Sequence, residues 1–69
     1  MRTDLIKASE LHFKAHIEKH RVNVEILLEN GVGVAEHPDI MEALLSEMKE
    51  IAENEDILEV ARNIPREVV

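Results

Sequence analysis

The positions of the helix-breaking residues are the strongest constraint on how this 69-residue chain can fold. Neither glycine nor proline occurs before Gly31, and after Pro38 the next such residue is Pro65. In both uninterrupted segments apolar residues recur at three- and four-residue spacing, which is the period of an amphipathic helix. Glycine or proline inside a helix costs about 1 to 3 kcal/mol, so their absence favours long helices. We therefore predict an all-α fold in a single domain, residues 1–69.

The predicted elements are a helix over about 4–30, a connection at 31–37, a helix over about 38–53, a helix over about 55–63 and a tail at 64–69. Thr3 is expected to cap the first helix, and Asn30-Gly31 to end it. Pro38 suits the first turn of the second helix, because its missing N–H is not needed there. Asn54 either caps a separate third helix or lies within one helix that bends. The tail is expected to fray.

The short connection predicts that the two long helices are antiparallel neighbours. Facing residue numbers should then add to about 68, so that Leu27 meets Met41 and His20 meets Met48, with Glu47 nearby. The residues expected to fill the contact are Ile6, Phe13, Ile17, Val24, Leu27, Leu44, Met48 and Ile51. Val32 and Val34 are expected to fold over its end. The predicted fold is an antiparallel helical hairpin, with a short third helix or a bent C-terminal arm.

A second set of apolar residues lies on the back of the first helix. Its main members are Leu11, Ala15, Val22 and Ile26. A second apolar stripe suggests a second packing partner, although nearby glutamates also allow an ordinary scattered surface. A chain this short has a marginal core, and without cysteine it has no disulfide to stabilise it. We therefore predict self-association, with a homodimer forming a helical bundle favoured and these four residues as the interaction face.

The charge of the chain is unevenly distributed. The formal net charge is −7, and residues 36–60 hold nine acidic residues against Lys49 alone. Such a surface repels phosphate backbones, so nucleic-acid binding is not expected. No apolar run approaches the roughly 20 residues that a membrane span needs, and a cytoplasmic location is the default. The alternative function is that of an acidic decoy or inhibitor that docks on a basic surface of a host protein.

Three histidines, His12, His16 and His20, are spaced four residues apart and so lie on one side of the first helix. They are weak candidates for a metal site, because a stable zinc site requires four ligands, or three with water. They can also act as a pH-sensitive group, or simply as polar residues beside and within the helix contact. The last interpretation is favoured; metal binding is the third candidate function, and no cofactor is predicted.

No pattern typical of catalysis is found. Ser9 and Ser46 have no triad spacing or nucleophile elbow around them, and the GVGV segment at 31–34 lacks the lysine and full glycine pattern of a phosphate loop. The carboxylates are numerous, but a helical hairpin offers no evident pocket to shift their pKa values. We expect no enzymatic activity.

One resemblance rests on residues 16–60, HIEKHRVNVEILLENGVGVAEHPDIMEALLSEMKEIAENEDILEV, centred on ENGVGVAEHPDI. This stretch resembles small uncharacterised helical proteins encoded by tailed phages that infect marine cyanobacteria and related bacteria. The resemblance implies a phage protein that acts in the host cytoplasm or within the virion. It implies no activity and no site residues.

Overall fold

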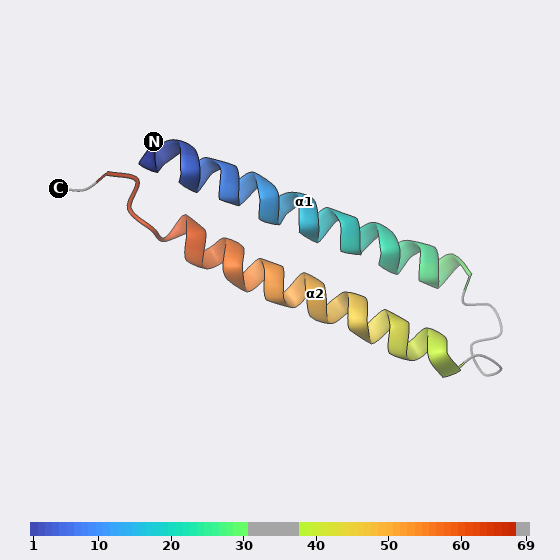
Figure 1. Ribbon diagram of the computed structural model, residues 1–69. Helices are drawn as coiled ribbons and strands as arrows, with labels where there is room; N and C mark the ends of the chain where they lie inside the picture. Colours follow the sequence, from blue (N-terminus) through green and yellow to red (C-terminus); the bar gives the residue numbers. More distant parts are fainter. Residues whose placement is uncertain (31–37, 68–69) are drawn as a thin grey trace.

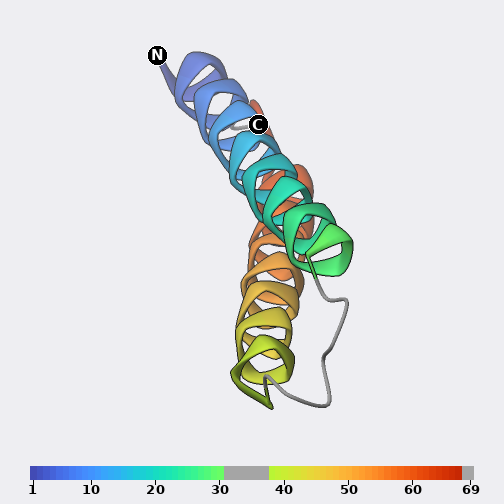
Figure 2. The ribbon, with the colours of Figure 1, turned by 90° about the vertical axis from the view of Figure 1, so that its right-hand side faces the viewer.

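The computed structural model describes residues 1–30 and 38–67, with Pro38 described in its backbone only. Two helices, α1 (Arg2–Glu29) and α2 (Pro38–Arg62), lie side by side and run antiparallel, so that α1 starts at the end of the hairpin where α2 finishes (Figure 1). Their axes are inclined to each other, as the turned view in Figure 2 shows. The predicted all-α hairpin is confirmed.

α2 is one continuous helix, so the separate helix predicted at about 55–63 is not formed. Asn54 lies inside α2 and is buried. Its Nδ2 donates a hydrogen bond of 2.7 Å to the backbone carbonyl of Glu50, one turn earlier. The asparagine side chain is therefore satisfied without capping a new helix, and nothing at this point interrupts the backbone.

The start of α1 also differs from the prediction. The helix begins at Arg2 without a side-chain cap, and the Thr3 hydroxyl instead lies 3.4 Å from the carbonyl of Arg66, to which it donates. Asn30 ends the helix as predicted, and its Nδ2 donates to the carbonyl of Ile26 at 2.8 Å. The turn predicted at Gly31 and the packing predicted for Val32 and Val34 lie outside the described residues.

The contact between the helices follows one strict pattern of alternating three- and four-residue steps. Its members, here called the seam, are Ile6, Glu10, Phe13, Ile17, His20, Val24 and Leu27 in α1 and Ile40, Leu44, Glu47, Ile51, Asn54, Leu58 and Ala61 in α2. Every one of them is buried or partly buried. A 3.5-residue repeat of this kind is the geometry of a coiled coil. Seven of the eight predicted contact residues belong to the seam.

The eighth, Met48, does not. Met48 and Met41 are each 50% exposed, and the seam positions beside them are held by Glu47 and Ile40. His20 pairs with Glu47 rather than with Met48, so facing residue numbers add to about 67, one fewer than predicted. A shift of one residue turns a helix by about 100°, which moves both methionines from the contact to its edge.

The tail is attached to the start of α1 rather than frayed over its described part. Nε of Arg2 donates to the carbonyl of Pro65 at 3.0 Å, and the guanidinium of Arg66 pairs with the carboxylate of Glu10 at 2.5 Å. Glu10 is a seam residue, so this ion pair satisfies a carboxylate at the edge of the helix contact. Val68 and Val69 lie outside the described residues.

The molecule is long and thin, with little interior. Its radius of gyration is 16.3 Å, whereas a compact chain of this length has about 11 Å. Among the described residues, only Ile6, Leu58 and Ala61 are buried apolar residues. The accessible surface is 5453 Å², compared with about 4,400 Å² for a compact protein of this mass. Over the described residues, neither helix holds an apolar stretch long enough to cross a lipid bilayer.

With so small a core, each buried side chain contributes a large share of the stability. Leu58 is 5% exposed and Leu5 is 62% exposed. We expect Leu58→Ala to lower the free energy of unfolding by about 2 kcal/mol, because it leaves a cavity in the seam. Leu5→Ala, the same change on the surface, should alter it by less than about 0.5 kcal/mol. Urea unfolding followed by circular dichroism measures both; equal losses would contradict the assignment of the core.

Candidate functional site

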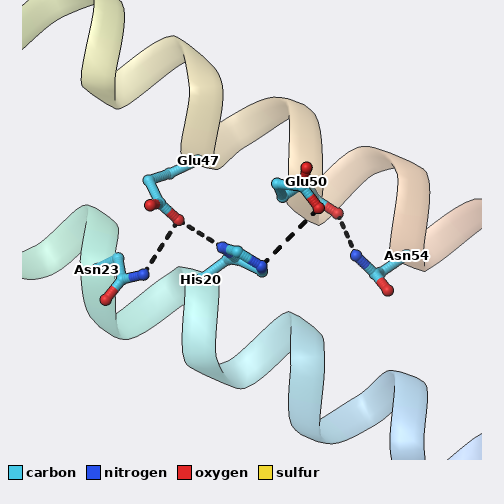
Figure 3. A network of polar contacts seen from close by, with 5 residues as sticks. All are labelled: His20, Asn23, Glu47, Glu50 and Asn54. Carbon is cyan, nitrogen blue, oxygen red and sulfur yellow. Dashed lines mark hydrogen bonds and ion pairs between the residues drawn. The ribbon is translucent and has the colours of Figure 1, made fainter.

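A cluster of polar side chains lies near the middle of the seam (Figure 3). Nδ1 of His20 on α1 is 2.5 Å from Oε2 of Glu47 on α2, a hydrogen bond in which the imidazole N–H donates to the carboxylate. The amide Nδ2 of Asn23 donates to the same oxygen at 3.2 Å. Nε2 of His20 faces a carboxylate oxygen of Glu50 at 3.9 Å. We call His20, Asn23, Glu47 and Glu50 the polar cluster.

The cluster is built by the seam pattern itself. His20 and Glu47 are both seam residues, and their side chains are 13% and 24% exposed. Desolvating a carboxylate or an imidazole is unfavourable unless hydrogen bonds replace the lost water. Here each polar group finds a partner on the opposite helix, and no buried side-chain nitrogen or oxygen in the described part of the chain lacks one. The predicted proximity of Glu47 to His20 is confirmed.

The charge of the cluster depends on its hydrogen bonds. The hydrogen bond from His20, followed by the one from Asn23, holds the pKa of Glu47 below its ordinary value. Both bonds favour the ionised carboxylate, because an acceptor without a proton takes them better. Each ring nitrogen of His20 faces a carboxylate, Glu47 at Nδ1 and Glu50 at Nε2. The cluster therefore joins the two helices through polar contacts on both sides of the imidazole ring.

The other two candidate histidines do not join the polar cluster. The ring of His12 lies 4.5 Å from that of His16 and meets Phe13 edge to face at 5.2 Å. The rings of His16 and His20 are 6.3 Å apart. Within residues 1–30 and 38–67, no three histidine or carboxylate side chains are grouped closely enough to hold a metal ion. The three histidines thus form a row along α1, and among the described residues His20 is the one of them that hydrogen-bonds to α2.

Two further seam positions are polar, and each has its own partner. Glu10 binds Arg66, and Asn54 binds the carbonyl of Glu50. Polar residues at the contact positions of a coiled coil favour one alignment of the helices over others. Sequence reasoning missed Glu10 and Asn54 as contact residues, although the alternating three- and four-residue spacing that runs through them was the signal that could have found them.

The predicted interaction face on α1 lies on the surface. Leu11, Val22 and Ile26 are 58%, 49% and 50% exposed, and Ala15 is exposed as well. A shallow depression there is lined by Glu18, Arg21, Val22, Glu25, Ile26 and Glu29. The structure also exposes apolar residues of α2 that the sequence placed in the contact, above all Met41 and Met48. Whether any of these surfaces binds a partner stays a prediction.

Acid should weaken the hairpin through Glu47. Because the pKa of Glu47 is lowered by folding from an ordinary value of 4.5, its contribution to stability is present above that pH and is lost as the pH falls through the folded-state pKa. We expect Glu47→Gln to lower the melting temperature at pH 7 and to flatten its decline below pH 4.5. Glu53→Gln, at an exposed position of the same helix, is the matched control. Equal pH profiles for wild type and Glu47→Gln would contradict this role.

Replacing the central pair by apolar residues should stabilise the hairpin. Buried ion pairs often contribute less than well-packed apolar side chains of similar volume, whereas removing one partner leaves the other uncompensated. We expect His20→Leu/Glu47→Leu to raise the melting temperature above that of either single variant and of the wild type. A double variant that melts below the wild type would show that the pair itself is the larger source of stability. Thermal denaturation at pH 7 measures this.

The chain was compared with known proteins at three levels. No protein-family model, no curated protein and no solved structure matches it. The resemblance to phage proteins therefore stays a prediction, and the geometry described above is what supports a function.

Proposed function

We propose that this chain is a small acidic helical interaction protein that self-associates through helix packing and acts by contact rather than by catalysis. The observation that carries the proposal is that the chain exposes more surface, and buries fewer side chains, than a compact protein of the same mass. Its accessible surface of 5453 Å² exceeds that of a compact protein of the same mass by about 1,000 Å². A typical stable interface buries about 800 Å² on each partner, so one such interface would remove most of the excess.

The composition of the exposed surface supports the same conclusion. Twelve large apolar side chains among the described residues are at least 42% exposed, and ten of them lie in the two helices, five in each. Single exposed apolar residues are ordinary, but a high density of them on a thin molecule favours a binding surface. Two-helix units commonly complete their core by pairing into four-helix bundles. Association would thus supply the core that the isolated hairpin lacks.

A second candidate function is supported by the exposed carboxylates of α2. Glu42, Glu53, Glu55, Asp56 and Glu59 are all exposed. A surface of this kind can dock on a basic patch of another protein, as an acidic decoy or inhibitor would. The two candidates differ in their response to salt, because salt screens exposed charges but does not weaken apolar packing.

The solution mass tests self-association directly. Light scattering after size-exclusion chromatography should give a discrete dimer or higher bundle at micromolar concentration, and 0.5 M NaCl should not dissociate it. The melting temperature should rise with protein concentration, because association stabilises the folded state by mass action. A monomer at every concentration, with a constant melting temperature, would refute the proposal and leave the acidic docking function as the better candidate.

A further inference from the structure

A second apolar stripe runs along α2 beside the seam. Its members, here called the α2 stripe, are Met41, Leu45, Met48 and Ala52, which repeat the alternating four- and three-residue steps of a helix contact. Met41 and Met48 are 50% exposed, Leu45 is 56% exposed, and Ala52 is exposed. At about 100° per residue, the four side chains fall within one narrow strip of the helix. The seam itself is already occupied by α1, so this strip has no partner within the hairpin.

We propose that the α2 stripe binds the same stripe of a second copy, with the two α2 helices antiparallel. This inference rests on the proposed self-association and names its surface. The excess accessible area described above is about what such an interface would bury. Methionine and leucine at helical spacing pack well against copies of themselves, because methionine adapts its shape to the space available.

The stripe is complementary to itself in the antiparallel direction. Its four positions are symmetric about a point between Leu45 and Met48. A two-fold axis at that point places Leu45 against the partner's Met48, and Met41 against the partner's Ala52. Every apolar residue then meets an apolar residue, as an interface between identical surfaces requires.

The charges beside the stripe favour the same direction. Glu42 and Lys49 both lie on the outer flank of the stripe, away from the seam. In the antiparallel arrangement Lys49 lies near the partner's Glu42, and the two-fold axis repeats this pair. A parallel two-fold arrangement would instead place the outer flank of each stripe against the seam side of the partner's stripe, so Lys49 and the partner's Glu42 would not meet. Opposite charges in such positions are favourable and commonly determine helix orientation.

The interaction face that the sequence predicted on α1, which includes Val22 and Ile26, is less suited to self-association. Val22 and Ile26 line a depression whose other walls are Glu18, Glu25, Glu29 and one arginine, Arg21. Two copies meeting there would bring six glutamates together against two arginines. In a chain with a net charge of −7, that concentration of carboxylates opposes self-pairing, whereas the flank of the α2 stripe provides one charge of each sign.

The first experiment compares one substitution on each face. Leu45→Glu should weaken the dimer at least about 30-fold, because a charge at the centre of an apolar interface removes its main packing contact. Val22→Glu, an equal change in charge at a position of similar exposure, should leave the dimer intact. Analytical ultracentrifugation measures both, with circular dichroism to show that each variant remains helical.

The outcomes separate the two proposals. A wild-type dimer that survives Leu45→Glu but is lost in Val22→Glu would overturn the α2 stripe and keep self-association. A wild-type monomer would overturn both. If Leu45→Glu loses its helical structure, the charge-reversal variants below test the α2 stripe instead, because they leave its apolar residues unchanged.

Charge reversal tests the orientation without altering the stripe. Lys49→Glu should weaken the dimer about tenfold by setting two glutamates against each other twice. Glu42→Lys/Lys49→Glu should restore the wild-type dissociation constant, because the pair is exchanged rather than broken. Lys7→Glu makes the same change in net charge near the start of α1, away from the α2 stripe, and should have little effect on the dissociation constant. Failure of the double variant to recover would overturn the antiparallel arrangement.

Cross-linking gives an independent result, because the chain contains no cysteine of its own. Mixed Met41→Cys and Ala52→Cys chains should form a disulfide between the two variants. Met41→Cys alone should not, since the two copies of that position would be about 16 Å apart along the antiparallel helices at 1.5 Å per residue, beyond disulfide reach. A rapid disulfide in Met41→Cys alone would show parallel helices and refute the proposal.

Discussion

The fold depends on a single line of contact between two helices. Each helix turns one face to the other. Along that face, only one residue in every three or four enters the contact. In a larger domain a helix is covered by several neighbours, so the loss of one contact is compensated by others. Here, within the described residues, each helix has only the other to pack against. The exposure of most large apolar residues follows directly, because a two-helix layer has no third element to cover them.

The polar residues in the seam contribute less stability than apolar residues would, but they favour one alignment of the two helices. An apolar seam of uniform composition tolerates sliding of one helix by a heptad, because every position finds an equivalent partner. The hydrogen bond between His20 and Glu47 is lost in any such shift, and the ion pair between Glu10 and Arg66 is lost with it. One alignment is therefore preferred over its neighbours. The same residues reduce the already small apolar core, which increases the benefit of association with a second chain.

The proposed dimer surface and the polar cluster lie on the same stretch of α2. Glu47 is adjacent in sequence to Met48, so the residue that fixes the hairpin alignment also determines which way the α2 stripe faces. If the helix were rotated by one residue, Met48 would enter the contact, as the sequence analysis expected, and the stripe would be divided. The correct placement of Glu47 is thus a condition for the proposed interface as well as for the hairpin.

The sequence by itself determined the two long helices, their antiparallel pairing and most of the seam, because the absence of glycine and proline and the apolar spacing are local properties that one chain segment carries alone. It also indicated that His20 lies near Glu47. Only the tertiary structure decided the alignment to within one residue, the continuity of α2 through Asn54 and the attachment of Arg66 to Glu10. These features depend on whether the free energy gained by burying a methionine exceeds that gained by hydrogen-bonding a carboxylate or an amide in the contact. Most of the groups involved are far apart in the chain, so their interactions can be compared only when both helices are in place.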